Sequence, residues 1–573
     1  MKRSGFRWGL LVALCAGIAY APMLGAGYAW DDAMFQRWQL PRFQTLSDAF
    51  FPPQQTGWMT GYYYRPVVLL SYMLDRAVAG ANTASAASWA HAANLLYHMA
   101  ATALTYVLAL AVFRGTPRRR GAAAGAALLF AIHPVHAESV CNIAGRTDVL
   151  ATLFVLGAAW AALRWRDAGL RRHGVACAAL LLLGLLTKET VLAALVFLPA
   201  LLLWVPASGE GKTEHPSVRQ HVELATLLLL STLAYLGLRT SAGVHYGASS
   251  PFSPAESLAR LTAALGYYVQ KVIVPWPQYH FVPELPPVRS AVLPLSVAVV
   301  AAGWALWRHK DGRKRIRLCL VWFLSSVAPA LVVALRPLAA TPVAERYLYL
   351  PSVAVCLLFG HWIARADLGR AGTKIAAGVA ALVVLAYAGS AFERTRAWQS
   401  NLTFWRDAVR NPAAARNGTA LINLGEAYQL AGMPDQATEC YRTALQVPET
   451  DTPTHLLARF FIGTIGLERA AAYLRAERPR EAFAWVDDAV STFEFVAANL
   501  PAYTPVHLAL GDALLLKAKA GAQASGTMDM ALLRRARAAL QEAFRLEAQN
   551  QRVRDDLAEC AQLLEHALAR PAP

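Results

Sequence analysis

The sequence predicts an all-α protein that crosses a membrane many times and ends in a water-soluble helical domain. Three observations lead to this fold class: an apolar composition, long apolar runs that recur along the chain, and a change of character near residue 392. Of the 573 residues, 56% are hydrophobic and only 16% are charged, and the mean hydropathy is +0.33. Such a chain is too apolar for a soluble globular protein and is long enough for two domains.

About eleven apolar runs have a length suited to a membrane span, for which about 20 residues are needed. They lie near residues 8–29, 92–113, 121–139, 147–163, 173–187, 190–205, 222–238, 289–307, 317–335, 347–363 and 374–391. The first run follows a basic start and resembles a signal peptide. Since many equally apolar runs follow it, we expect it to remain as a membrane anchor.

Basic residues cluster before the first run and in four of the connections between the runs. The clusters lie at residues 2–3, 114–120, 164–174, 307–317 and 364–374. All of them fall on one side of the membrane, and the positive-inside rule makes that side cytoplasmic. The net charge of +17 is therefore interpreted as a topology signal rather than as a sign of nucleic-acid binding. With eleven spans, the chain beyond residue 392 lies outside.

The outer segment begins with a pattern typical of a tetratricopeptide repeat, in which small residues let paired helices pack closely. The pattern comprises Leu421, Leu424, Gly425, Tyr428, Ala437, Tyr441 and Ala444, then Tyr473, Ala482 and Ala489, and finally Leu510, Gly511, Ala536, Leu540 and Ala543. The alternative is an irregular helical bundle. We predict a transmembrane domain (1–391), an interfacial linker (392–417) and a repeat α-solenoid with a concave groove (418–573).

Polar segments gather on the side opposite the basic clusters. They are YAWDD (28–32), YYYRP (62–66), HPVHAESV (133–140), TKET (187–190), the 240–288 loop and VAERYLYLPS (343–352). Charges this close to apolar spans are costly unless they face a cavity or a partner, so the cluster predicts a site at the outer interface. The alternative is that the aromatic and arginine side chains only anchor helix ends.

The order of these motifs resembles a known family. The segments are YAWDD, YYYRPVVLLSYMLDRAV, HAANLLYHMAATAL, AIHPVHAESVCNIAGRTDVLA, LLTKE, AERYLYLPS and RTRAWQSNLTFWRDAV, followed by the repeats. From about residue 28 to 445 they resemble the transmembrane-and-tetratricopeptide-repeat O-mannosyltransferases and their bacterial relatives, of the GT-C glycosyltransferase class. The resemblance implies a polytopic helical fold that passes a sugar from a polyprenyl-phosphate donor to an acceptor on the non-cytoplasmic side. The carboxylate pair in the first outer loop is the hallmark of that class.

Asp31 and Asp32 are the expected catalytic pair. A serine or threonine hydroxyl is a poor nucleophile at neutral pH, so its attack on the sugar needs a base beside the attacking oxygen. An inverting single displacement needs no second, nucleophilic carboxylate. The other aspartate would orient substrate or raise the pKa of its neighbour. We favour Asp31 as the base, and the alternative for either residue is an N-cap of a following helix.

The leaving lipid phosphate needs cations, and Arg65, Arg346 and Lys188 are the candidates. A guanidinium pairs bidentately with phosphate oxygens and keeps its charge near lipid. We favour Arg346, with Glu345 as the residue that orients it. The alternative is a charged residue that only reaches for solvent or forms a salt bridge at a helix end, which for Lys188 would involve the adjacent Glu189.

The two histidines of HPVHAES could be zinc ligands, but their spacing in the sequence does not favour a zinc site. A proline separates His133 from His136, and neither an HExxH motif nor a CxxC pair accompanies them. We expect His133, His136 and Glu138 to line the sugar or acceptor pocket instead. Arg146 and Asp148 are expected to form an ion pair that holds the next helix in place.

Two classes of function remain after these observations. The first is a glycosyltransferase that uses a polyprenyl-phosphate-linked sugar, with mannose expected from the family, and whose repeat groove recruits an acceptor protein. A glycolipid or cell-wall glycan is the alternative acceptor. The second class is a non-catalytic membrane scaffold with an external repeat domain. No resident cofactor is predicted, although a divalent metal is left open, and the composition favours the cytoplasmic membrane of a bacterium, with the repeats in the periplasm.

Overall fold

The computed structural model describes residues 3–34, 40–52, 63–80, 83–208, 218–244, 251–336, 339–365, 370–448 and 452–569. Tyr62 of the YYYRP motif and residues 245–250 of the predicted outer loop lie outside these ranges. The chain divides into two compact units, Met1–Asp407 and Ala408–Pro573, called unit 1 and unit 2 below. The described residues form helices and no strand, as the sequence predicts for an all-α protein.

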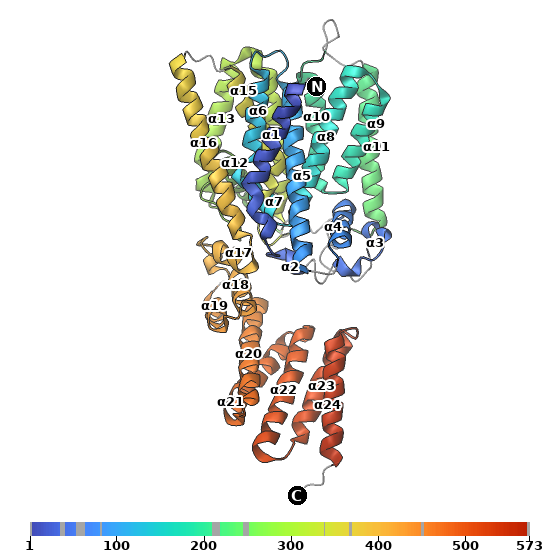
Figure 1. Ribbon diagram of the computed structural model, residues 1–573, viewed down its shortest axis with the longest axis vertical. Coiled ribbons are helices and arrows are strands. Elements are labelled where there is room, and N and C mark those ends of the chain that lie inside the picture. The colour runs from blue at the N-terminus through green and yellow to red at the C-terminus, as the bar shows by residue number, and fades with distance from the viewer. Residues whose placement is uncertain are drawn as a thin grey trace. The chain divides into compact units, whose positions relative to one another are not determined.

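Unit 1 is a bundle of long helices with shorter helices near one end (Figure 1). The helices are α1 (Arg3–Tyr20), α2 (Asp31–Met34), α3 (Leu46–Phe50), α4 (Pro66–Ala79), α5 (Thr83–Val112), α6 (Arg119–Ala131), α7 (Ala137–Cys141), α8 (Arg146–Ala168), α9 (Arg171–Leu185), α10 (Ala194–Trp204), α11 (Val218–Ser241), α12 (Pro254–Ile273), α13 (Val288–Arg308), α14 (Arg313–Leu335), α15 (Tyr349–Arg365), α16 (Arg370–Ala397) and α17 (Asn401–Ala408). Three 3-10 turns matter for the site: η5 (Pro134–His136), η6 (Glu189–Ala193) and η8 (Glu345–Leu348).

Within the described ranges, eight helices are long and apolar enough to cross a membrane, or nine if the bent pair Arg119–Ala131 and Pro134–Cys141 forms one span. The predicted number was about eleven, and two of the predicted runs form helices shorter than these. The predicted runs 173–187 and 190–205 form α9, which has 15 residues, and the short apolar segment Glu189–Trp204. A 15-residue helix rises only about 22 Å, less than the hydrocarbon core of about 30 Å.

The outermost spans have the surface expected of helices in contact with lipid. In both α13 and α16 only 11% of the span is buried within the protein. Their valine and leucine side chains are exposed, and a helix that is apolar all round and yet uncovered is stable in a bilayer and not in water. The chain is a multi-pass membrane protein, as predicted.

Hydrogen bonds and an ion pair bring together three of the predicted basic loops. Arg114 Nη1 lies 2.8 Å from Asp167 Oδ2 and 3.0 Å from the carbonyl oxygen of Pro206, while Arg315 Nη2 donates to the carbonyl oxygen of Arg114 over 3.2 Å. The N-terminus lies at this end of the unit, and α2, α4 and α7 lie at the other (Figure 1). The basic loops and the predicted site are therefore separated by the length of the helices.

The described residues of unit 2 form seven α-helices: α18 (Gly418–Leu430), α19 (Pro434–Gln446), α20 (Thr452–Arg475), α21 (Pro479–Asn499), α22 (Thr504–Ser525), α23 (Met530–Leu546) and α24 (Gln551–Ala569). Glycines allow close approach between successive helices, because a Cβ atom on Gly425 would overlap with Tyr441 and one on Gly511 would overlap with Leu540. All four residues belong to the predicted repeat pattern. This pairing of small with large residues is typical of stacked helical repeats, and the tetratricopeptide assignment stays a prediction.

Residues 392–407, called the junction segment below, were predicted to be part of an interfacial linker but lie inside unit 1. Trp398 and Phe404 are 0% exposed and Trp405 is 2% exposed. Their rings contact Trp30 and Phe281, so these side chains pack inside unit 1 rather than in an exposed linker. Burial against other aromatic side chains removes more apolar surface from water than an interfacial position would.

Candidate functional site

A cavity of about 610 Å³ opens among the helix ends that carry the predicted site. Its polar part includes Asp31, Arg65, Lys188 and Arg346, and its apolar part includes residues 328–333 of α14. The structure thus brings four of the sequence-predicted site residues, from four separate segments of the chain, to one cavity. Such a lining suits a ligand that joins an anionic group to an apolar chain.

The two adjacent aspartates have different surroundings. Asp32 is 1% exposed, and its carboxylate accepts hydrogen bonds from the backbone N–H groups of Ile143 (3.1 Å) and Ala144 (2.9 Å). Asp31 lines the cavity, and within the described part of the chain no hydrogen bond occupies its carboxylate. Both are the first residues of α2, so neither is its N-cap. Asp32 holds the first outer loop on the turn before α8, which leaves Asp31 facing the cavity.

Burial tunes both carboxyl groups toward neutral pH. It raises the pKa of Asp31 to about 6, with the guanidinium of Arg346 opposing and the carboxylate of Glu138 reinforcing the shift. It raises the pKa of Asp32 to about 7, although the backbone N–H groups of Ala144 and Ile143 oppose the shift. A carboxylate with a pKa near the working pH is a stronger base than an ordinary one and is still mostly ionised. Asp31 is therefore both accessible from the cavity and more basic than an ordinary carboxylate.

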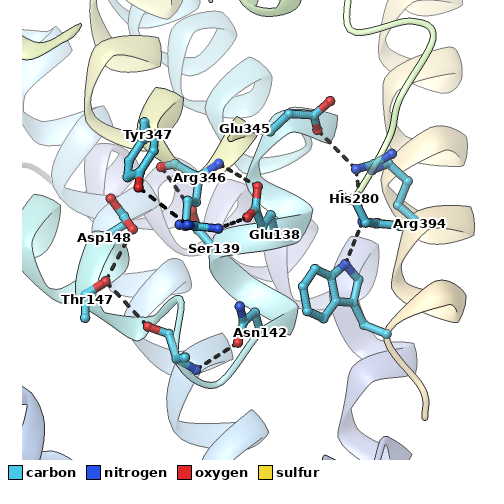
Figure 2. Close-up of polar contacts among 12 residues, drawn as sticks. Glu138, Ser139, Asn142, Thr147, Asp148, His280, Glu345, Arg346, Tyr347 and Arg394 are labelled. Carbon is cyan, nitrogen blue, oxygen red and sulfur yellow. Dashed lines mark hydrogen bonds and ion pairs between the residues drawn. The ribbon is translucent and has the colours of Figure 1, made fainter. Parts of the chain in front are cut away.

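Glu138, not Glu345, orients Arg346. The guanidinium of Arg346 pairs with one carboxylate oxygen of Glu138, and the backbone N–H of Arg346 donates to the other oxygen over 3.0 Å. Figure 2 shows the side chain of Glu345 directed instead toward Arg394, and their ion pair spans 3.1 Å. Neighbours in a 3-10 turn project about a third of a turn apart, so Glu345 and Arg346 reach different partners. The predicted orienting role of Glu345 is wrong.

The other two predicted phosphate ligands also have carboxylate partners. Arg65 Nη2 lies 2.8 Å from Glu189 Oε1, and its guanidinium lies 4.2 Å from the ring centroid of Tyr63. Lys188 Nζ lies 2.6 Å from Asp148 Oδ1, so its salt bridge is not with the adjacent Glu189. Each cation is held in place at the cavity wall by its partner.

Arg146 does not pair with Asp148 as predicted. It is 0% exposed, and it contacts Asp75 Oδ2 at 2.5 Å, Asn94 Oδ1 at 2.6 Å and the carbonyl oxygen of Ala90 at 2.9 Å. Residues two apart on a helix point to different sides, which separates Arg146 from Asp148. Arg146 joins the start of α8 to α4 and α5, and the predicted structural role is fulfilled with another partner.

The two histidines lie in the protein core, away from the residues that line the cavity. His133 Nε2 lies 3.1 Å from the carbonyl oxygen of Val272, and His136 Nε2 lies 2.8 Å from Ser352 Oγ. Both side chains are at most 1% exposed. The expectation that they line a sugar or acceptor pocket is wrong. Glu138 is also absent from the cavity lining, and it acts by holding Arg346 and by reinforcing the raised pKa of Asp31. Among the described residues, no group of three His, Cys, Asp or Glu side chains is placed to hold a metal ion.

Several residues of the cavity wall are missed by the sequence interpretation, among them Trp30, Tyr347, Arg239 and Arg336. Arg239 lies in a candidate span, Val218–Ser241. An arginine there is costly unless it faces a cavity or partner, so this signal was present in the sequence. Trp30 directly precedes the aspartates but has no motif of its own.

Comparisons with known proteins agree with the motif resemblance. The chain is 32% identical over 194 residues to protein O-mannosyl-transferase Tmtc2 of Drosophila melanogaster, which is 32% of this chain and 20% of that protein. It is 43% identical over 94 residues to protein O-mannosyl-transferase TMTC1 of Mus musculus (16% and 9%). It is 24% identical over 449 residues to TMTC3 of the same species (69% and 45%). The chain thus spans less than half the length of each of these relatives.

The remaining comparisons are weaker. No protein-family model matches the chain. A crystal structure of the Archaeoglobus fulgidus oligosaccharyltransferase, tethered with an acceptor peptide, aligns with 79% of this chain and 60% of its own at 13% identity, but its TM-score of 0.39 is too low to establish a shared fold. The sequence relatives are sufficient to confirm the predicted resemblance, and the chain is a multi-pass membrane protein similar to the protein O-mannosyl-transferases.

Proposed function

We propose that this protein is a membrane glycosyltransferase that moves a sugar from a polyprenyl-phosphate donor to serine or threonine side chains of acceptor proteins. Mannose is the sugar that the names of the relatives suggest. The observation that carries the proposal is that Asp31, Arg346 and a set of apolar side chains line the same cavity. A lipid-linked sugar phosphate has matching parts: an isoprenoid chain, a phosphate and an anomeric carbon.

The donor is held by the cations and by the apolar wall. Arg346 pairs with the phosphate oxygens through its guanidinium, while Glu138 keeps that guanidinium oriented. Arg65 and Lys188 add positive charge at the same cavity. Because each cation already has a carboxylate partner, it is in position before the donor arrives, and little reorganisation is needed when charge develops. The side chains of α14 accept the start of the polyprenyl chain.

The transfer is a single displacement. Asp31 takes the proton from the acceptor hydroxyl as its oxygen bonds to the anomeric carbon, and the bond between that carbon and the phosphate oxygen breaks. The lipid phosphate leaves with the electron pair and is stabilised by Arg346. Attack from the face opposite the leaving group inverts the anomeric configuration. Asp32 acts indirectly, since its two backbone hydrogen bonds fix the loop that carries Asp31.

The remaining parts of the proposal concern place and partners. The site faces the non-cytoplasmic side, which in a bacterium is the periplasm, and unit 2 binds the acceptor protein through a repeat groove. The lipid-linked sugar is a substrate, and no resident cofactor or nucleic acid takes part.

The test is a transfer assay with the purified full-length protein in nanodiscs. Polyprenyl-phosphate-mannose labelled in the sugar is mixed with unfolded acceptor proteins and with short serine- and threonine-containing peptides, and mass spectrometry locates the added hexose. We expect O-linked hexose of inverted configuration, and loss of it in Asp31→Asn. Label found only in added glycolipid would favour the alternative acceptor, and donor binding without any transfer would favour a scaffold.

A further inference from the structure

The residue directly before Asp31 has an unusual backbone conformation. Trp30 has a φ of 53°, in the left-handed region that bulky residues rarely adopt. A side chain in this region is strained, and the conformation persists only where the surrounding structure holds it. Because Trp30 and Asp31 share a peptide bond, whatever holds Trp30 also sets the direction of the Asp31 side chain.

The contacts that hold Trp30 come from the junction segment, more than 360 residues later in the sequence. The backbone N–H of Trp30 donates to Asn401 Oδ1 over 3.0 Å, and its ring stacks on that of Phe404 with centroids 5.4 Å apart and planes 17° apart. Nearby, the N–H of Gly27 donates to the carbonyl oxygen of Gln399 over 2.9 Å. The turn that precedes the aspartates is thus fixed at both its backbone and its side chain.

The ring of Trp30 also meets the proposed phosphate ligand. The guanidinium carbon of Arg346 lies 5.6 Å from the ring centroid of Trp30, a distance at which a cation is attracted by the ring. Trp30 therefore contacts Phe404 and Arg346 with its ring and Asp31 through its backbone. A displacement of this one residue would move the base and would remove one ring contact of the arginine.

A second set of contacts runs from the junction segment to the neighbour of Arg346. Arg394 Nη2 lies 3.1 Å from Glu345 Oε2, and His280 Nδ1 accepts hydrogen bonds from Arg394 (3.1 Å) and from Trp398 Nε1 (3.0 Å). Figure 2 shows Glu345, Arg394 and His280 linked one after another by these contacts. All are buried, where a broken polar contact is costly. The segment therefore supports the site from two directions.

We propose that two residues of the junction segment, Asn401 and Phe404, are positioning residues for Asp31. The inference rests on the proposed glycosyl transfer. Its physical basis is that a misplacement of about 1 Å of a reacting group costs about 100-fold in rate, and Asn401 holds the backbone one residue away from the base. Arg346 keeps its two contacts with Glu138, so the segment matters more for turnover than for donor affinity.

The test compares Asn401→Ala with Thr403→Ala in the full-length protein. Thr403 lies in the same helix, is exposed and bonds only near its own position, so its variant controls for a general weakening of α17. We expect Asn401→Ala to lower kcat about tenfold or more with little change in the KM for the donor, and Thr403→Ala to behave as wild type. Asn401→Asp keeps an acceptor oxygen for the N–H of Trp30 and should restore most of the kcat.

A second readout needs no transfer activity. Carboxyl-directed chemical labelling at a series of pH values, read by peptide mass spectrometry, gives the titration midpoint of Asp31. In the wild type it should lie near the pKa of about 6, and in Asn401→Ala it should fall toward that of an ordinary carboxyl group, because a released Asp31 is better hydrated. If the wild-type protein has no transfer activity, only the proposed function is contradicted. The labelling would still show whether Asn401 and Phe404 position Asp31.

The outcomes that overturn the inference are specific. If Asn401→Ala retains the wild-type kcat and the wild-type midpoint of Asp31, or loses kcat only as much as Thr403→Ala does, the junction segment does not position the base. If Asn401→Ala is not recovered as a folded protein, Phe404→Leu takes its place with the same expectations, since it removes the stacked ring and keeps an apolar side chain.

Discussion

Exchanging each aspartate of the pair for asparagine should separate chemistry from support. An asparagine at position 31 has the same size as Asp31 but cannot take a proton from the acceptor. We expect kcat to fall by about 10²- to 10⁴-fold, the range for loss of a general base. Folding should not suffer, because Asp31 lines the cavity and its carboxylate accepts no hydrogen bond from the described residues.

Asp32→Asn should have the opposite profile. The carboxylate of Asp32 accepts from two backbone N–H groups, one on each oxygen, whereas an amide offers one oxygen and turns its NH₂ toward the other donor. A buried donor left without a partner costs about 1–3 kcal/mol. We therefore expect a clear loss of thermal stability and a smaller loss of kcat, which would arise from displacement of the loop.

The pH dependence of the transfer rate and of stability also separates the chemical role of Asp31 from a structural one. With its pKa raised to about 6, Asp31 is about 90% ionised at pH 7, and the rate should fall about tenfold per pH unit below 6. The sign for stability is opposite: a raised carboxyl pKa means that the folded state binds the proton more tightly than the unfolded chain, so stability falls as the pH rises from about 4 to 6. Asp31→Asn removes the contribution of Asp31 and keeps that of Asp32, whose pKa is raised to about 7. The variant should therefore show a weaker dependence on pH and be no less stable than wild type at pH 7.

The assay is single-turnover transfer to a short peptide between pH 5 and 8, with melting temperatures measured on the same samples. The reasoning fails if Asp31→Asn retains transfer within about twofold of wild type, or if its residual transfer keeps the acid limb near pH 6. It also fails if Asp31→Asn melts at a lower temperature than Asp32→Asn, because Asp31 rather than Asp32 would then have the structural role.

The remaining predictions concern topology and the division of labour between the units. Reporter fusions after Arg120 and Arg317 should read cytoplasmic and a fusion after Arg396 external, as the clustered basic loops require, and a cytoplasmic signal at Arg396 would place unit 2 on the wrong side for the proposed acceptor. A chain ending at residue 410 should keep transfer to short peptides and lose transfer to long proteins, since only the latter gain effective concentration from a groove. A chain ending at residue 392 should lose transfer to short peptides and to long proteins. If the chain ending at residue 410 loses transfer to both acceptors equally, unit 2 takes part in catalysis itself.

The long helices could be predicted from the sequence because a bilayer imposes a length and a composition that hydropathy detects directly. The lengths of the helices are less well predicted by the same rule. The apolar segments 173–187 and 190–205 are rich in leucine, but a glycine-containing short helix and a 3-10 turn at Glu189 shorten them. An apolar run shows that a segment avoids water, and it does not show whether its helix is long enough to span the membrane.

The cavity residues could be predicted as members of one site because topology alone places helix ends on one side of the membrane. Their partners could not. Nearness in the sequence favours Glu345 as the partner of Arg346, and Asp148, two residues away, as the partner of Arg146. Backbone geometry turns such neighbours apart, and the actual partners, Glu138 and Asp75, come from other parts of the sequence.

The junction segment shows where the composition of a chain and its domain boundary differ. The predicted boundary near residue 392 marks the point at which the chain becomes polar enough to leave the lipid, but the compact unit extends to Asp407. Trp398 and Phe404 follow the candidate span Lys374–Ala397 and are still buried, because the ring of Trp30 packs against both. This contact joins segments more than 360 residues apart, which no local pattern encodes. A cut at the change in composition would therefore remove Asn401, the acceptor for the backbone of Trp30, and release the base that the first outer loop presents.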